Sequence, residues 1–341
     1  MNFTKASALA LDGAMCAMMF AIQRRHRLDG TSRGALERYI AQHEAATRDA
    51  YYFLPPLAAN AEVGSRKAEW RTIPAPGAPS SAFHTPHSLR WVSPLSTGFA
   101  ENDRVHVDLY PCPAGWTAPT VLMLHALMSA SDGGYRQWAA RFNARGWNAC
   151  FVHLPYHYSR TPRAHWNGEL AITADCIRNA EGLRQGVVEL RQLMAQLRAW
   201  GGREFGVWGS SYGGWIGGLL ASVERDFRFV ALLEPIVDVG HAIWTSPAGA
   251  ALRRELHRAG IEPSLVARHF PLASPSHGEP LCGAKRVIFC GGEYDLIAPI
   301  DAIERLHARW RGSEMLRIPQ GHFGYRIMRT AWTHLTEKGA V

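Results

Sequence analysis

The chain has 341 residues, of which 47% are hydrophobic and 12 are tryptophan, so it can bury a large core in one α/β domain with insertions or in two small domains. Its formal net charge is +8, but the arginines are scattered and no stripe interleaves basic with aromatic residues. We therefore expect no nucleic-acid binding. A mildly basic surface is equally compatible with acidic lipids or anionic substrates.

The six cysteines are spread along the chain, and none forms a Cys-x-x-Cys pair. Cys150 and Cys290 lie in apolar runs, where a cysteine is usually a small buried hydrophobe. Cys150 and His153 would point to opposite faces of a strand, which argues against shared zinc ligation. This usage is typical of a reducing compartment, and we expect a cytoplasmic protein.

The N-terminal part contains an apolar segment, residues 14–22, which has about half the length that a membrane span needs. Its positive cluster, residues 24–27, follows the apolar segment, whereas a signal peptide carries its positive charge first. We therefore expect no transmembrane segment but a helix packed on the body of the protein. Peripheral membrane contact is the alternative.

Helical periodicity extends over residues 1–60, and Pro55 and Pro56 end this segment. Residues 61–87 are rich in Pro, Ala and Ser, which predicts an irregular connector over the surface. The chain is thus expected to consist of a helical N-terminal extension with its connector, 1–87, and a main domain, 88–341.

The main domain begins with two expected strands, 88–92 and 104–110. In the second strand His106 and Asp108 alternate with apolar residues, which predicts a half-exposed antiparallel pair. Residues 121–125 are almost continuously apolar, as expected for a strand that is buried on both faces.

From residue 120 onward, apolar strands alternate with amphipathic helices. This alternation predicts an α/β fold with a doubly wound, mostly parallel sheet and antiparallel N-terminal strands. Residues 235–283 interrupt it with apolar residues that lack a strand period, which indicates a small helical cap or lid. The expected strands are 121–125, 148–154, 205–209, 229–233, 285–291 and 315–318, and the helices are 135–145, 180–200, 212–223, 299–310 and one from about 323.

One motif in this alternation is Gly-x-Ser-x-Gly, with Ser211 between Gly209 and Gly213. An apolar strand before it and an apolar helix after it predict a nucleophile elbow, in which the serine hydroxyl stands at the strand tip above a helix N-terminus. The glycines let neighbouring backbone pass close to the turn. Because the pattern is short, a plain Gly-rich strand-to-helix turn is the competing interpretation.

A serine nucleophile needs a base and an acid on neighbouring loops at the same edge of the sheet. Asp295 follows a strand tip and precedes a helix that starts with Pro299, and Glu293 and Asp301 are its rivals. His322 lies in the Gly-His loop after the last strand. A turn-capping aspartate and a histidine without catalytic function are the plainer alternatives.

The chain order Ser211, Asp295, His322 is the order of an α/β-hydrolase triad. With these three motifs the chain resembles the α/β-hydrolase superfamily over residues 88–340, including its lipase/esterase and dienelactone-hydrolase-like branches. The resemblance implies a sheet of the α/β-hydrolase type and catalysis by a serine hydrolase.

The same resemblance implies an oxyanion hole made of two backbone N–H groups. We expect Tyr212, which follows the nucleophile, to supply one of them. Leu127, in the loop after strand 121–125, is expected to supply the other, with Met128 as the alternative. Ala126 stands where the superfamily often has glycine.

The loop after strand 148–154 faces the predicted site, and we expect Tyr156 and Arg160 in it, together with Met128, to bind substrate. Arg160 is equally compatible with a role as an anchor of this loop. His125, His153 and His157 suggest a metal site, but no acidic ligand adjoins them in sequence, so no metal is expected.

These inferences predict a cofactor-independent serine hydrolase that acts on a small-molecule carboxylic ester or thioester, with an apolar acyl or alcohol group. Amide hydrolysis and acyl transfer use the same triad and stay open. A non-catalytic α/β-hydrolase scaffold used for binding is the alternative from another class. Oligomeric state is not predicted by the sequence.

Overall fold

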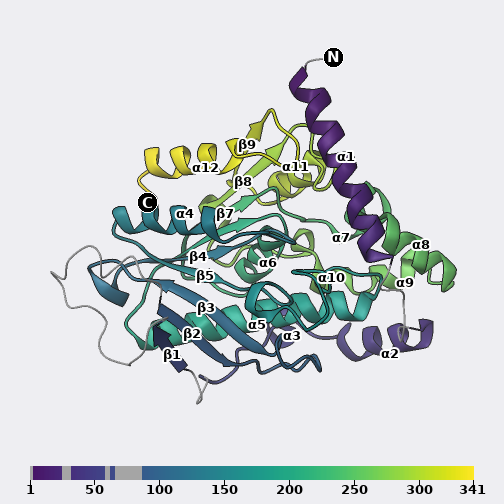
Figure 1. The fold of residues 1–341 in the computed structure, drawn as a ribbon, viewed down its shortest axis with the longest axis horizontal. Coiled ribbons are helices and arrows are strands. Elements are labelled where there is room, and N and C mark those ends of the chain that lie inside the picture. The colour runs from purple at the N-terminus through teal and green to yellow at the C-terminus, as the bar shows by residue number, and fades with distance from the viewer. Residues whose placement is uncertain (1–2, 25–31, 58–61, 66–86) are drawn as a thin grey trace.

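The computed structural model describes residues 3–24, 32–57, 62–65 and 87–341. Within this part of the chain one sheet of nine strands has the order β1-β2-β3-β5-β4-β6-β7-β8-β9 (Figure 1). The pairs β1–β2, β2–β3 and β3–β5 are antiparallel, and every other pair is parallel. The predicted fold class is therefore confirmed. The strands are β1 (Glu62–Ser65), β2 (His87–Val92), β3 (Arg104–Tyr110), β4 (Thr120–Leu124), β5 (Asn148–Val152), β6 (Phe205–Ser210), β7 (Phe227–Leu233), β8 (Val287–Gly292) and β9 (Glu314–Ile318).

Helices cover both faces of the sheet. α4 and α12 share one buried cluster with the strands, and α5, α6 and α11 share the other. Within β5, Cys150 and Val152 belong to the larger cluster, while Ala149 and Phe151 belong to the smaller one. This alternation follows from the two-residue period of a strand, and it explains why β4, β5, β6 and β8 are buried at every position. The helices are α4 (Gly133–Ala144), α5 (Cys176–Ala199), α6 (Tyr212–Ala221), α11 (Ile300–Arg309) and α12 (Arg326–Glu337).

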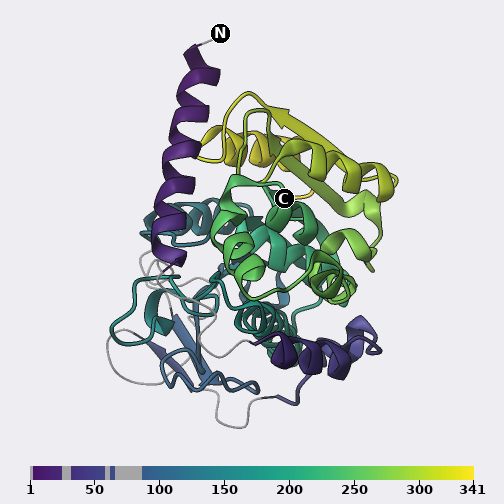
Figure 2. The same cartoon turned by 90° about the vertical axis from the view of Figure 1, so that its right-hand side faces the viewer.

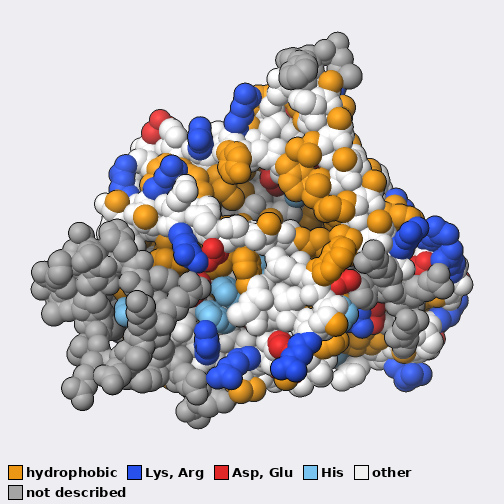
Figure 3. Space-filling model, in the orientation of Figure 1, with side chains coloured by type: hydrophobic (Ala, Val, Ile, Leu, Met, Phe, Trp, Pro, Cys, Tyr) orange, Lys and Arg blue, Asp and Glu red, His pale blue; other side chains and the backbone are white. Residues whose placement is uncertain are grey.

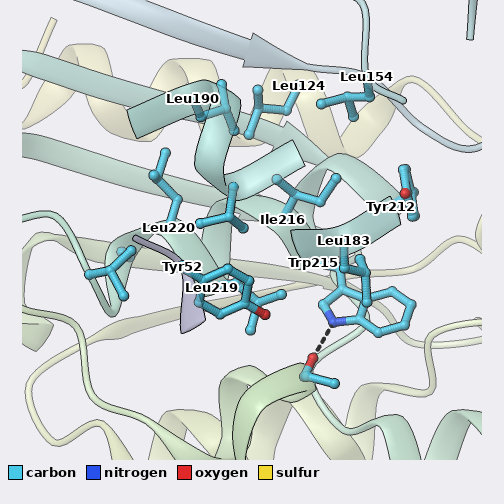
Figure 4. Close-up of a cluster of buried hydrophobic side chains, with 14 of the residues drawn as sticks. Tyr52, Leu124, Leu154, Leu183, Leu190, Tyr212, Trp215, Ile216, Leu219 and Leu220 are labelled. Carbon is cyan, nitrogen blue, oxygen red and sulfur yellow. Dashed lines mark hydrogen bonds between the residues drawn. The ribbon is translucent and has the colours of Figure 1, made fainter. Parts of the chain in front are cut away.

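Helix α6 lies in the middle of the larger core. Figure 4 shows Ile216 and Leu220 of this helix among apolar side chains such as Leu183 and Leu190 of α5. The indole Nε1 of Trp215 donates a hydrogen bond of 2.7 Å to the carbonyl oxygen of Ala273. The helix behind Ser211 is thereby tied to the segment that follows β7.

That segment, residues 235–283, was expected to form a helical cap. In the structure it contains four short helices between β7 and β8. Most of its buried apolar residues belong to the larger core, so it packs against the main body beside α6 rather than standing apart. The four are α7 (Val239–Trp244), α8 (Ala250–Arg258), α9 (Pro263–Ala267) and α10 (Phe270–Ala273).

The expected half-exposed strand pair is wrong for β3. His106 and Asp108 are both buried, because β5 pairs with β3 and places His153 against them. The His106 ring stacks on the His153 ring with centroids 4.3 Å apart, and its Nε2 is 3.1 Å from Asp108 Oδ1. A polar residue at every second position therefore marks a buried hydrogen-bonded cluster here.

The N-terminal extension contains three helices, α1 (Phe3–Gln23), α2 (Arg33–His43) and α3 (Arg48–Tyr51). The prediction of a wholly irregular connector is wrong at Glu62–Ser65, which forms β1 and pairs with β2. Residue 61 and residues 66–86 of that connector lie outside the described residues.

Helix α1 is longer than the apolar segment 14–22. By length and composition alone, its portion Thr4–Gln23 would suffice to cross a membrane, and 22% of its apolar window is buried. The helix stands upright at one side of the molecule and projects beyond the body (Figure 2). Leu11 and Met18 are exposed, whereas Asp12 and Cys16 are buried. One face of α1 is therefore packed on the protein, as expected, and another is open.

Candidate active site

Ser211 stands between the end of β6 and the start of α6, with φ 51° and ψ −110°. A non-glycine residue rarely adopts this backbone conformation, and such strain is typical of functional positions. A Cβ on Gly209 would lie 2.6 Å from the Gly213 carbonyl oxygen, and one on Gly213 would lie 2.2 Å from that of Leu124. The Ser211 N–H donates to the carbonyl oxygen of Leu233 at 2.7 Å, which holds the turn in place.

The three residues predicted to form a triad meet in space. His322 Nε2 is 2.8 Å from Ser211 Oγ, and His322 Nδ1 is 2.7 Å from Asp295 Oδ2. All three residues are buried. The imidazole thus links a carboxylate to a hydroxyl, which is the arrangement that lets a serine act as a nucleophile.

Asp295 occupies the loop between β8 and α11. Its Oδ1 accepts the N–H groups of Ile297 at 2.7 Å and Ala298 at 2.8 Å, so Oδ2 is left for the imidazole. These bonds fix the rotation of the carboxylate. Of the rival acids, Glu293 is exposed and Asp301 forms an ion pair within α11.

The charge around His322 favours its protonated form. Burial by itself lowers the pKa of an imidazole, but the carboxylates of Asp295, Glu234 and Asp12 outweigh this effect and raise the pKa of His322 to about 9. The neutral ring is therefore a stronger base than an ordinary histidine. Such a base suits the removal of a proton from a serine hydroxyl.

The predicted oxyanion loop follows β4, and His157 supports it. The His157 Nδ1–H donates to the carbonyl oxygen of Pro155 at 2.8 Å, so Nε2 accepts the N–H of Met128 at 3.1 Å. Burial lowers the pKa of His157 to about 4, which keeps the ring neutral at pH 7. The Leu127 N–H has no acceptor among the described residues. This favours Leu127 over Met128 as the second donor.

His125 supports the same loop from the other side. Its Nδ1–H donates to the carbonyl oxygen of Ala126 at 2.9 Å, and its Nε2 accepts the N–H of Leu154 at 3.1 Å. Burial lowers the pKa of His125 well below its ordinary value. Both ring nitrogens of His125 and of His157 are therefore occupied. This arrangement argues against the metal site that the histidine-rich sequence suggests.

No protein-family model and no curated protein matches the sequence. Solved structures do. Acetyl xylan esterase from Paenibacillus sp. R4 is similar with a TM-score of 0.63 and 14% identity, over 93% of this chain and 98% of that one. The chain has the α/β-hydrolase fold. Acetyl xylan esterase 1 from Thermoanaerobacterium sp. JW/SL YS485 gives 0.60 and 14%, over 92% and 97%. Pyrococcus horikoshii acylaminoacyl peptidase gives 0.51 and 15%, over 74% and 40%.

Two further carboxyl groups of this chain reach the triad, and the sequence analysis assigned a role to neither. Glu234 follows β7 with φ 50°, and its Oε1 accepts the side-chain amide of Gln320 at 3.0 Å. Burial raises the pKa of Glu234 well above its ordinary value. Asp12 comes from α1, more than 300 positions from His322, and contacts the backbone of the loops that carry Asp295 and His322. A lone acid in an apolar helix was the only sequence signal for it.

A cavity of about 140 Å³ opens on Ser211. Figure 3 shows a hollow beside α1 with hydrophobic side chains gathered around it. The cavity wall is almost entirely apolar and combines the N-terminal helices, α5, α6 and the cap. Representative lining residues are Met19, Leu36, Ile40, Leu127, Leu183, Trp215, Ile243 and Phe270.

Three predicted substrate-binding residues do not line this cavity. Arg160 is fully buried, and its guanidinium binds both carboxylate oxygens of Glu189 at 2.6 and 2.8 Å. It also donates to the carbonyl oxygens of Asn102 and His153, so no donor face is left for substrate. Arg160 is therefore a loop anchor, and the prediction of substrate contact is wrong. Tyr156 is likewise buried in the core, and Leu127, not Met128, lines the cavity.

Among the described residues, two further groups have the composition of a metal site. One is Glu234 with Asp295 and His322, which belongs to the candidate active site, and the other is His106, Asp108 and His153. The second group combines two imidazoles with one carboxylate. The two imidazole planes are parallel to within 4° and stacked. Lone pairs in two parallel planes cannot converge on one ion, and a metal requires converging ligands at about 2.0–2.1 Å. The cluster therefore fits a carboxylate that two stacked imidazoles hold in place.

Proposed function

We propose that this protein is a serine hydrolase that cleaves a carboxylic ester or thioester through an acyl-enzyme on Ser211. The observation that carries the proposal is the continuous hydrogen-bonded connection from Asp295 through His322 to Ser211, built on a strained elbow. The α/β-hydrolase fold and the apolar cavity beside the serine support it.

The chemistry follows from the positions of these groups. Ser211 Oγ attacks the carbonyl carbon while His322 Nε2 takes its proton, and Asp295 stabilises the imidazolium. The N–H groups of Tyr212 and Leu127 stabilise the oxyanion. His322 then gives its proton to the leaving group. A water molecule that His322 deprotonates hydrolyses the acyl-enzyme and releases the acid.

The cavity indicates the class of acyl group. Its volume of about 140 Å³ is close to that of an engineered apolar cavity that holds benzene, so it suits an apolar group of roughly six carbon atoms. Two structural neighbours are named acetyl xylan esterases, but an acetyl group alone would leave most of this wall without a partner. We propose a medium-length apolar acyl group.

Amide hydrolysis and acyl transfer are kept as second candidates, because they use the same triad and one structural neighbour is named an acylaminoacyl peptidase. A panel of p-nitrophenyl esters of graded chain length, with a matched p-nitroanilide, separates these reactions. A maximum of kcat/KM near six carbons is expected. A maximum at acetyl would contradict the assignment of the cavity.

Fluorophosphonate labelling tests the enzyme against a non-catalytic scaffold. The wild-type protein should be labelled, and Ser211→Ala should not. Ser210→Ala is the matched control, because Ser210 adjoins the nucleophile but forms no part of the relay. His322→Ala should lower ester hydrolysis by several orders of magnitude, on the order of triad losses measured in other enzymes. A folded wild type that resists labelling would favour the binding scaffold.

The proposal extends to cofactor use, location and membrane contact. The mechanism uses no cofactor, and the substrate is a small molecule. The cysteine usage favours a cytoplasmic location, and all six thiols are free. Peripheral contact with a membrane is proposed for α1, because its open face is apolar and Lys5 and Arg24 are exposed near its two ends.

A further inference from the structure

Helix α1 carries one carboxyl group into the catalytic centre. Asp12 is fully buried, and its Oδ2 accepts the N–H of Leu296 at 3.1 Å and that of His322 at 3.0 Å. Its Oδ1 also lies 3.1 Å from the His322 nitrogen. One side chain of the N-terminal extension therefore bonds to the loop of the acid and to the loop of the base.

These bonds account for an otherwise unfavourable residue. An acid in the middle of an apolar helix costs free energy unless its oxygens find donors. Asp12 forms no ion pair with any described residue, so the two backbone N–H groups are what compensates its burial. Hydrogen bonds from N–H groups to a carboxylate are stronger than those between neutral groups.

The loop between β8 and α11, which carries Asp295, donates hydrogen bonds to two carboxyl groups. Three successive N–H groups point inward, and Asp295 takes those of Ile297 and Ala298 while Asp12 takes that of Leu296. Without the Asp12 carboxylate, the N–H of Leu296, next to Asp295, would lose its hydrogen bond. The loop that aims Asp295 Oδ2 at the imidazole would then keep its bonds to Asp295 Oδ1 and to Ser246 Oγ, but it would lose its bond to α1.

The loop between β9 and α12, which carries His322, also leaves room for the Asp12 carboxylate. A Cβ on Gly321 would lie 2.9 Å from Asp12 Oδ1 and 3.0 Å from Oδ2, and these are the nearest atoms it would meet. Gly321 has no positive φ, so turning freedom does not explain the glycine. The glycine of the Gly-His loop is needed because the carboxylate of α1 passes close to it.

We propose that Asp12 is a positioning residue for the triad, so that docking of α1 aligns Asp295 and His322. This inference rests on the proposed function. Because Met19 and Gln23 of α1 also line the cavity, one docking event would complete the acyl site and order the catalytic loops together.

The first test compares two substitutions of Asp12 with a control on the same helix. Asp12→Ala removes both acceptors and should lower kcat about 10- to 100-fold, since small displacements of catalytic groups have effects of this size. Asp12→Asn should lose less, because the amide oxygen still accepts. Cys16→Ala is the control: it is buried one turn further along and removes packing only. Equal losses in Asp12→Ala and Cys16→Ala, or a wild-type kcat in Asp12→Ala, would overturn the proposal.

The pH profile separates positioning from a general loss of folding. Asp12, Asp295 and Glu234 all face His322, so removing the Asp12 charge should shift the acid limb of kcat/KM to lower pH. The shift should appear in Asp12→Asn and Asp12→Ala but not in Cys16→Ala. An unshifted limb in both Asp12 variants would count against the proposed contact.

A double-mutant cycle tests the contact itself. Gly321→Ala should lower kcat in the wild type, because its methyl group displaces the carboxylate, and should add little in the Asp12→Ala background. Full additivity would mean that Gly321 acts through other groups. Ser211→Ala separates the proposed function from the positioning role of Asp12. If Ser211→Ala keeps its activity, the proposed function is refuted. If Ser211→Ala is inactive but Asp12→Ala is as active as the wild type, only the positioning role is refuted.

Discussion

His322 is the residue on which the charges of the site converge. Three carboxyl groups surround it, and the hydrogen bonds distinguish their tasks. Asp295 bonds to the ring, Asp12 bonds to the backbone N–H of the same residue, and Glu234 is joined to the loop through Gln320. Only Asp295 is therefore placed to set the tautomer of the imidazole, while all three influence its pKa.

This arrangement predicts an alkaline enzyme. Neutral His322 is the form that accepts the Ser211 proton, and its pKa is raised to about 9. We therefore expect kcat/KM to increase with pH up to about 9 and to level off above it, because the inactive imidazolium dominates at lower pH. The measurement is kcat/KM from pH 6 to 10 on a p-nitrophenyl ester, with the Ser211→Ala rate subtracted. A plateau that already begins near pH 7 would contradict it.

Arg160 illustrates a residue whose importance is structural. Its guanidinium and the Glu189 carboxylate are both buried, so loss of one partner leaves the other charge unpaired in the core. We expect Arg160→Met to lower the free energy of unfolding by about 3–5 kcal/mol, measured by urea denaturation. The double variant Arg160→Met/Glu189→Leu should regain much of this loss. A raised KM with unchanged stability would instead restore the substrate-binding interpretation.

Residues differ in how far the sequence could predict them. Ser211, Asp295 and His322 were predictable because each follows a strand that its own apolar period identifies. Asp12 was not, since nothing local indicates that a helix at the N-terminus reaches a loop near the C-terminus. Arg160 was ambiguous because a basic residue in a loop suits both an anchor and a ligand contact, and only its partner Glu189 decides.

At the scale of elements, the loop after β4 is held by neutral histidines rather than by glycine. His157 bonds to the backbone N–H of Met128, and His125 bonds to the carbonyl oxygen of Ala126. The side chain of Ala126 is accommodated because the loop conformation is set by these bonds. The loop therefore presents the Leu127 N–H on a rigid support.

A substitution behind the loop tests this support. A Cβ on Gly168 would lie 2.4 Å from His157 Nε2 and 2.9 Å from the Met128 nitrogen. Gly168→Ala should therefore displace the loop and lower kcat by about 10-fold or more, since one oxyanion donor is worth about 100- to 1,000-fold.

Gly146→Ala is the matched control, because Gly146 has nearly the same φ and open space around it. Alanine at either position is strained by the positive φ, but only the added methyl group at position 168 would contact the oxyanion loop. Equal kcat values for the two would show that His157 does not support the oxyanion loop.

The elements themselves were largely predictable, because buried parallel strands and amphipathic helices have different periods. β3 shows the limit of this reasoning. Alternation of His106 and Asp108 with apolar residues indicates two different faces, but it does not say whether the polar face is covered. Here His153, which directly follows β5, covers it, and that pairing is a tertiary contact. β1 was missed because four residues are too few for a period.

At the scale of the whole molecule, the cavity is assembled from segments far apart in the chain. The N-terminal helices, the sheet loops, α5 and the cap each contribute one part of the wall. The large apolar fraction thus serves a core that continues into the candidate acyl site, where Trp215 belongs to both. Truncation of the N-terminal extension would open the cavity as well as release Asp12.

The open face of α1 leads to the last prediction. Leu11 is 46% exposed and Met18 is 42% exposed, and the chain carries a net charge of +8. An apolar helix face with basic ends is attracted to an anionic lipid surface. We expect the protein to co-float with phosphatidylglycerol vesicles but not with vesicles of phosphatidylcholine alone, and we expect added salt to release it.

Leu11→Glu together with Met18→Glu should abolish this binding, because the apolar contact is lost and negative charge is added. Leu281→Glu is the matched control: Leu281 is a leucine of similar exposure, bonded to the end of α6 remote from the elbow. Because Leu11, Met18 and Leu281 are exposed whereas Asp12 is buried, hydrolysis of a soluble ester should be the same in the wild type and in both variant proteins. Equal flotation of the α1 variant and the control would refute membrane contact by α1. If the wild type is a dimer in solution and the α1 variant is a monomer, while both still float with the vesicles, a second copy of the chain is the partner of this face.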